Sequence, residues 1–504
     1  MNITFDTYKD KVRACWLGKN IGGTLGAPFE CNRGVYDLEF YTHDLSQGVL
    51  PNDDLDLQLI WLNAAEHYGK ALTAEILAEY WLSYIVADWS EYGAAKNNLK
   101  FGLLPPVSGW YNNHNKDSCG CFIRSEIWAC LAPGHPEIAV RYAREDGICD
   151  HADEGLYGEL FCAALQSAAF VESDMDKLVE IALKYIPDNC AVAKGVMTAI
   201  NAYKSKKTWK EARRDVLKAV PGTFGMYRGY VDMEPEHDIP VGEPGFDAPS
   251  NIGLMMVGWL YGEGDFSKSI CIAAGCGEDA DCTAGTLAAT LGIIYGTKGI
   301  DKKWLEPIGD EIKTISLDLT KGTVIIPKTV TELTDRVVKL MPTFMLDNFE
   351  FDSDGKIVIL ESKDLLDTTV NKGTFMQKVD VRNELCATAK SIIKENPVIR
   401  MRIEFEDGLF LKNGQEKKLK LCLENKIASQ QWLNVRCLVP EGWKAVPAKN
   451  FCVNLDQRHG GCSISESFFS IIPEELETGR HTLVFEVTSL GRVSVLYVPV
   501  VFIV

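Results

Sequence analysis

The spacing of apolar residues changes once along this 504-residue chain, and that change constrains the fold more than any other feature. Up to about residue 342, segments such as LTAEILAEYWLSYIVADW return an apolar residue every three or four positions, which predicts helices. Later segments such as IRMRIEF and HTLVFEV alternate apolar and polar residues, which predicts antiparallel strands. We therefore expect a multidomain α and β chain, with an all-α helical bundle over 1–343, a connecting segment over 344–395 and an Ig-like β-sandwich over 396–504.

Charge and hydropathy exclude several classes of protein. The formal net charge of −18 argues against a nucleic-acid partner, because phosphate binding depends on clustered Lys and Arg. No apolar run resembles a membrane span, and the first residues, MNITFDTYKDKVRACWLG, lack the basic start and apolar core of a signal peptide. We expect a cytoplasmic protein with no membrane partner, whose cysteines are mostly buried and reduced.

Two acidic clusters stand at expected helix starts. The first is NDDLD over residues 52–56, and the second is GEDADCTAG over residues 277–285. One interpretation is helix capping, because free backbone N–H groups and the helix dipole stabilise carboxylates there. The other is a cation site, because carboxylates that lie close together shift their pKa or bind a metal, and oxygen ligands suit Mg²⁺ or Mn²⁺. Spacing alone leaves both interpretations open.

Small residues follow the second cluster and recur along the next turns, as in TAGTLAATLG. They allow neighbouring helices to approach closely, while the interleaved leucines fill space. We expect a central buried helix whose first acids face a pocket rather than open solvent.

Three motifs occur in order: CWLGKNIGGTLGAPFE (15–30), NDDLD and GEDADCTAG. Over about residues 8–300 they resemble the ADP-ribosylglycohydrolase family, as do GCFIRSEI (120–127) and DHADEGLYGELFCAAL (150–165). The resemblance implies an all-α orthogonal helical bundle with a centre of one or two Mg²⁺ ions, with Mn²⁺ possible. It also implies a metal-dependent hydrolase that cleaves a glycosidic bond and removes ADP-ribose from an acceptor.

Site residues are carried over from the resemblance by position. The implied metal ligands are Asn52, Asp53, Asp54, Asp279, Asp281 and Cys282. The implied catalytic residues are Glu30, Asp53, Asp54 and Asp281, with Glu30 as a general base or a gate. His151, together with Asp153, is expected to line the ribose pocket. Asn52 and Cys282 replace threonines of the family pattern, and Gly23 replaces an aspartate.

Other candidate substrate contacts have structural alternatives. Trp110 and Tyr111 are expected either to stack on a base or sugar ring or to be buried loop aromatics. Arg124 is expected to contact a phosphate, or to pair with Glu126 or a main-chain carbonyl. His237 is a candidate lid residue.

Three functions stay open at this stage. The first is removal of ADP-ribose from an ADP-ribosylated substrate. The second is a glycoside or nucleoside hydrolase that uses the same metal clamp on another small-molecule glycoside. The third is a catalytically silent binding protein derived from the family, and the C-terminal domain is expected to serve packing or carbohydrate contact.

Overall fold

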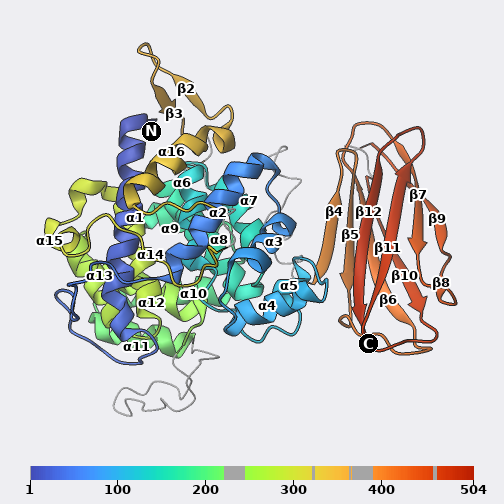
Figure 1. The fold of residues 1–504 in the computed structure, drawn as a ribbon, viewed down its shortest axis with the longest axis horizontal. Coiled ribbons are helices and arrows are strands. Elements are labelled where there is room, and N and C mark those ends of the chain that lie inside the picture. The colour runs from blue at the N-terminus through green and yellow to red at the C-terminus, as the bar shows by residue number, and fades with distance from the viewer. Residues whose placement is uncertain (1, 221–244, 321–323, 363–364, 366–389, 458–462) are drawn as a thin grey trace. The chain divides into compact units, whose positions relative to one another are not determined.

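The computed structural model describes residues 2–220, 245–320, 324–362, 365, 390–457 and 463–504. The chain divides into two compact units, one of Met1–Lys96 with Asn112–Asn383 and one of Asn97–Tyr111 with Glu384–Val504 (Figure 1). The predicted order of a helical domain followed by antiparallel sheets is confirmed. The orthogonal packing of the bundle and the sandwich arrangement of the sheets stay predictions.

Helices make up most of the first unit. They are α1 (Phe5–Gly26), α2 (Asp53–Tyr68), α3 (Ala74–Tyr84), α4 (Ser90–Lys100, whose last residues belong to the second unit), α6 (Glu126–Leu131), α7 (Pro136–Gly147), α8 (Asp153–Ala169), α9 (Met175–Leu183), α10 (Ala191–Lys204), α11 (Trp209–Ala219), α12 (Ala248–Gly262), α13 (Phe266–Gly275), α14 (Ala280–Tyr295), α15 (Lys302–Leu305) and α16 (Val330–Met345). Among the described residues, no helix is both long and apolar enough to cross a membrane.

Helices α1 and α14 form the closest helix pair around the site. A Cβ atom on Gly18 or Gly22 of α1 would overlap the main chain at Ala288 or Ala284 of α14. Only glycine permits this approach, and as a result α14 is buried from Ala280 to Ile294. The prediction of a central buried helix behind the second acidic cluster is therefore confirmed.

A small antiparallel sheet, in the order β1-β3-β2, joins the two ends of the first unit. Its strands are β1 (Ile3–Thr4), β2 (Phe349–Phe351) and β3 (Ile357–Ile359), and Ile3 pairs with Ile359. The predicted connecting segment thus contributes β3, which pairs with the start of the chain, and β2, which pairs with β3.

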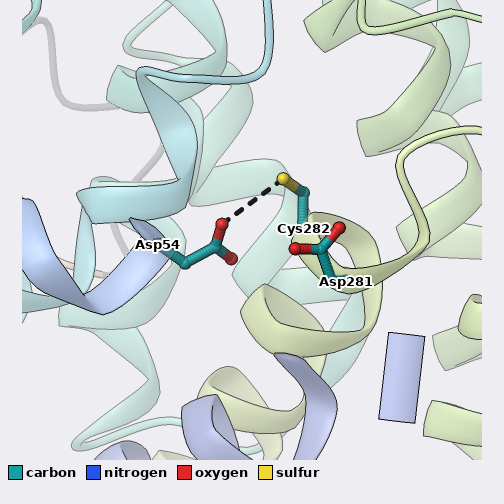
Figure 2. A group of neighbouring side chains, drawn as sticks. All are labelled: Asp54, Asp281 and Cys282. Carbon is teal, nitrogen blue, oxygen red and sulfur yellow. Dashed lines mark hydrogen bonds between the residues drawn. The ribbon is translucent and has the colours of Figure 1, made fainter. Parts of the chain in front are cut away.

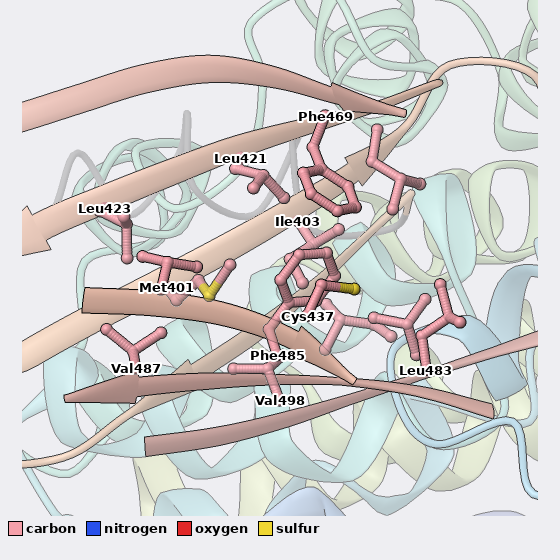
Figure 3. Close-up of a cluster of buried hydrophobic side chains, with 14 of the residues drawn as sticks. Met401, Ile403, Leu421, Leu423, Cys437, Phe469, Leu483, Phe485, Val487 and Val498 are labelled. Atoms are coloured by element: carbon pink, nitrogen blue, oxygen red, sulfur yellow. The ribbon is translucent and has the colours of Figure 1, made fainter. Parts of the chain in front are cut away.

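The second unit holds a five-stranded antiparallel sheet, β4-β5-β6-β10-β8, and a four-stranded one, β12-β11-β7-β9. The strands are β4 (Ser391–Glu395), β5 (Ile399–Phe405), β6 (Lys417–Asn425), β7 (Gln431–Leu438), β8 (Lys444–Val446), β9 (Asn450–Leu455), β10 (Ile464–Ile472), β11 (Arg480–Ser489) and β12 (Val495–Ile503). Buried and exposed residues alternate strictly along β7, and buried side chains from both sheets form one cluster (Figure 3). Leu103 and Val107, from the segment that contains α5 (Val107–Trp110), complete this cluster.

Candidate metal centre

The first acidic cluster begins α2, and its side chains have different partners. Asn52 is the N-cap, and its Oδ1 accepts a hydrogen bond of 2.7 Å from the Asp54 backbone N–H. Asp56 is fully buried and its Oδ2 accepts hydrogen bonds from the backbone N–H groups of Ile315 and Ser316, at 2.7 and 2.6 Å. Asn52 therefore caps α2, and Asp56 anchors the loop at residues 315–316.

The second acidic cluster begins α14 after a turn in which Gly277 and Glu278 both have positive φ. Asp279 is the N-cap residue, but its side chain makes no capping hydrogen bond. Asp279 and Asp281 are 3% and 5% exposed, and Oδ1 of each has no hydrogen-bond partner. Capping thus does not account for these carboxylates, and a buried oxygen without a partner destabilises the protein unless a cation or water satisfies it.

The two helix starts converge. Ligand atoms of Asp54, Asp281 and Cys282 lie within 4.8 Å of one another, and those of Glu30, Asp279 and Asp281 do so as well. Figure 2 shows the Asp54 carboxylate and the Cys282 thiol turned toward each other beside Asp281, with Sγ 3.4 Å from Asp54 Oδ1. We call the first set the Cys282 group and the second the Glu30 group; Asp281 belongs to both.

Mutual repulsion and burial set the electrostatics of this centre. Burial, followed by the charges of Asp54 and Asp56, raises the pKa of Asp53 to about 8. Glu30 follows η1 (Ala27–Phe29) and is exposed as a residue, but the protein surrounding its carboxylate, followed by Asp279, raises its pKa to about 8. Burial also raises the pKa values of Asp279 and Asp281 well above the usual range. Carboxylates with these shifts favour a nearby cation.

Lys19 is a buried cation of the centre that sequence reasoning missed. It is 2% exposed on α1, and its Nζ lies 3.2 Å from Asp54 Oδ2 and 3.1 Å from Glu126 Oε1. Burial lowers the pKa of Lys19, but the Asp54 and Glu126 carboxylates outweigh this effect and raise it, so the side chain stays charged. The available signal was one lysine inside the small-residue run LGKNIGG.

The predicted ribose-pocket histidine is fully buried. His151 Nε2 lies 2.7 Å from Ser118 Oγ, and its Nδ1 lies 3.1 Å from Asp150 Oδ2. Asp153 lies at the start of α8, where its carboxylate pairs with Lys116 at 2.9 Å.

Arg124 is bonded within the protein. Its guanidinium is fully buried and donates to Asp146 at 2.9 Å, to Asp150 at 2.6 Å and to the Gly120 carbonyl at 2.5 Å. Of the alternatives for this residue, a main-chain carbonyl contact is present, while Glu126 pairs with Lys19 instead.

The remaining candidates are not among the described residues of the helical unit. Trp110 and Tyr111 belong to the second unit, where the Tyr111 ring centroid is 5.9 Å from that of Phe410. His237 lies outside the described residues.

The donor set fits a divalent cation. Four carboxylates converge, and three of them present a buried oxygen without a hydrogen-bond partner, which is the environment that Mg²⁺ and Mn²⁺ prefer. Of these oxygens, Asp54 Oδ2 lies 3.2 Å from the Lys19 ammonium. Cys282 adds one sulfur, a softer donor than the threonine hydroxyl of the family pattern. Asp53 belongs to neither group, but the charges of Asp54 and Asp279, one from each group, contribute to its raised pKa.

Comparisons with known proteins identify the family. The family model described as ADP-ribosylglycohydrolase matches residues 4–341. A search of curated proteins finds no match. Among solved structures, an ADP-ribosylglycohydrolase-related protein complex is similar at 16% identity, covering 67% of this chain and 99% of that one, with a TM-score of 0.42. The GAE domain of GGA2p from Saccharomyces cerevisiae is similar at 13% identity, covering 23% and 96%, with a TM-score of 0.15.

Proposed function

The chain belongs to the ADP-ribosylglycohydrolase family, and from this premise we propose that it is a metal-dependent hydrolase that cleaves a glycosidic bond, removing ADP-ribose from an acceptor. Family membership supports the conclusion that the protein is an enzyme with a glycohydrolase-type function. The observation that carries the metal dependence is the pair of buried oxygens, Asp279 Oδ1 and Asp281 Oδ1, that lack a partner where α2 and α14 converge.

In this proposal, Asp279 and Asp281 hold a divalent ion beside the Glu30 carboxylate, and Asp53 and Asp54 are the other acids of the centre. When bound, Mg²⁺ or Mn²⁺ orients sugar hydroxyls and lowers the pKa of a water molecule. Glu30 has its carboxylate among the acids although the residue is exposed, a position that suits a general base or a gate. Asp281 belongs to both acidic groups and therefore connects them.

One observation favours the second candidate, a hydrolase of another glycoside. A pyrophosphate-bearing ligand needs cationic partners, but Arg124 is already bonded to Asp146 and Asp150. A neutral sugar makes no such demand.

Calorimetry with Mg²⁺ and Mn²⁺ tests the metal centre. We expect the wild-type protein to bind at least one of the ions and to melt at a higher temperature with it, and Asp281→Asn to lose affinity by about tenfold or more. Asp335→Asn is the matched control, because Asp335 is an exposed aspartate of the same unit that pairs with Lys9. If neither ion binds or raises the melting temperature, the proposal of a metal-dependent function is wrong. That result would favour the alternative of a catalytically silent binding protein.

A substrate panel separates the enzymatic candidates. ADP-ribosylated protein, ADP-ribosyl phosphate and a series of pentosides are assayed with the metal that calorimetry identifies. Release of ADP-ribose supports the first candidate. Turnover of the pentosides alone moves the assignment to the second.

A further inference from the structure

The two acidic groups differ in how their negative charge is balanced. In the Cys282 group, Asp54 has an ammonium 3.2 Å from Oδ2 and a thiol 3.4 Å from Oδ1. In the Glu30 group, none of the three carboxylates forms an ion pair with a lysine or arginine of the described residues. One group therefore has a resident cation, and the other does not.

Lys19 is built into this position. Its Nζ contacts Thr286 Oγ1 at 3.2 Å in addition to the two carboxylates, and Glu126 is held in turn by Gln58, whose Nε2 donates to Oε2 at 2.9 Å. Gly285 leaves space for the pair, because a Cβ there would lie 3.3 Å from Asp54 Oδ2 and 3.5 Å from Lys19 Cδ. The ammonium is thus held on several sides and is not a mobile surface charge.

A fixed buried ammonium would repel a second metal ion bound beside Asp54. Charges of the same sign repel strongly where water is excluded. An ion bound by Asp54 would approach Lys19 closely, and moving Lys19 away would leave Glu126 buried without its cation. Asp54 Oδ2, Asp279 Oδ1 and Asp281 Oδ1 all lack a hydrogen-bond partner, but only Asp54 Oδ2 lies in an ion pair with Lys19. An ion bound by Asp279 and Glu30 would contact carboxylates that have no such ion pair.

We propose that Lys19 takes the place of one metal ion, so that this chain binds a single divalent cation, in the Glu30 group. The inference rests on the proposed metal-dependent function. It assigns Lys19 as a positioning residue that neutralises Asp54, whereas the resemblance to the family left one or two ions open.

The test counts Mn²⁺ bound per chain by equilibrium dialysis with elemental analysis, with Mn²⁺ as the only ligand. We expect one ion per wild-type chain and an electron paramagnetic resonance spectrum without Mn–Mn exchange coupling. In Lys19→Met/Glu126→Gln, which removes the ammonium together with its second carboxylate partner, we expect the count to rise to two and the coupled spectrum to appear. Lys96→Met is the control, because Lys96 is a buried lysine that contacts the carbonyls of Ile85 and Ala87.

The outcomes distinguish this inference from the function on which it rests. Two ions per wild-type chain overturn the inference and leave the metal-dependent function standing, whereas no bound ion overturns both. A double variant that keeps its circular dichroism spectrum and still binds one ion also overturns the inference. The wild-type count needs no variant, so it decides the question even where the double variant does not fold.

Discussion

Glu30 illustrates, at the scale of single residues, how the candidate site stores electrostatic strain. Its carboxylate lies among those of Asp279 and Asp281, and its pKa is raised to about 8. Since the raised pKa records an unfavourable environment for the charge, the residue destabilises the metal-free protein when ionised. A side chain kept at such a cost is more easily explained by function than by packing.

Replacing Glu30 with glutamine is expected to separate activity from stability. Glu30→Gln keeps the size of the side chain but removes the charge and the basic oxygen. We expect turnover to fall about 100-fold or more, in the range of a lost general acid or base, while the melting temperature in EDTA rises slightly. Glu180→Gln, at an exposed position of α9, is the control. Full activity in Glu30→Gln would remove Glu30 from the mechanism.

Sequence reasoning predicted which residues supply the acids but not their partners. Carboxylates at helix starts are a local pattern, so Asp54, Asp279 and Asp281 were identifiable from NDDLD and GEDADCTAG alone. That Lys19 pairs with Asp54 depends instead on how α1 lies relative to α2 in the fold, and no spacing within one helix encodes that distance. The same limit applies to Arg124, whose carboxylate partners lie 22 and 26 positions further along the chain.

At the scale of elements, Glu278 joins the start of α14 to the loop after η1. Its carboxylate accepts two hydrogen bonds from Arg33, at 2.6 and 3.0 Å, and one from the Gly245 backbone N–H, and its own N–H donates to the Asn32 carbonyl at 3.1 Å. This loop directly follows Glu30, so the clamp places Glu30 against the second acidic cluster. Glu278 is the first acidic residue of GEDADCTAG, but its contacts give it a structural role beside the acidic centre.

Glu278→Gln is expected to weaken this clamp. Glu278→Gln removes the carboxylate charge from a buried ion pair with Arg33, and we expect the free energy of unfolding to fall by about 3 kcal/mol or more. Chemical denaturation measures it. In the double variant with Arg33→Met, the loss should be smaller than the sum of the single losses; additive losses would show that the two side chains do not couple.

The close contact between α1 and α14 leads to a second prediction for the elements, on the effect of Gly22→Ala. In Gly22→Ala the new methyl group would overlap the main chain at Ala284, so the helices must separate. We expect destabilisation of about 1–3 kcal/mol, in spite of the higher helix propensity of alanine, and weaker Mn²⁺ binding because α14 carries Asp281. Thermal melting and calorimetry test it. An unchanged or higher melting temperature would contradict the close packing of these helices.

On the scale of the whole molecule, the division of the chain does not follow its order. Periodicity predicted helices before strands, but Asn97–Tyr111 belongs to the strand unit, with Leu103 and Val107 in its core. The segment FGLLPPVSGW reads as an irregular loop, because its apolar residues have neither helical nor strand spacing. Membership of a core depends on tertiary contacts that such a segment does not encode.

Leu103→Ala tests this assignment. Leu103 is 2% exposed, and truncating a buried leucine removes about 2–5 kcal/mol of stability. We expect the strand unit to unfold at lower denaturant while Mn²⁺ binding by the helical unit is unchanged at low denaturant. Leu319→Ala, at an exposed position, is the control. An unaffected strand unit would show that residue 103 does not contribute to its core.

The acidic centre gives the metal-free molecule a pH dependence of defined sign. Asp53 and Glu30 have pKa values of about 8 when folded, against about 4 for carboxyl groups of an unfolded chain. The folded state therefore binds more protons, so the stability that these groups contribute is fully present below about pH 4 and is lost as the pH rises through about 8. In EDTA, we expect their contribution to lower the melting temperature between about pH 6 and pH 9.

A bound cation should reverse most of this loss, because it favours the ionised carboxylates that the empty centre disfavours. The increase in melting temperature on adding Mg²⁺ or Mn²⁺ should accordingly be larger at about pH 9 than at about pH 6. The double variant Glu30→Gln/Asp53→Asn isolates the contribution of these two groups, since it should flatten the EDTA profile relative to the wild type. If the wild type and the double variant show the same pH profile in EDTA, Glu30 and Asp53 are not the groups whose titration sets the pH dependence of stability.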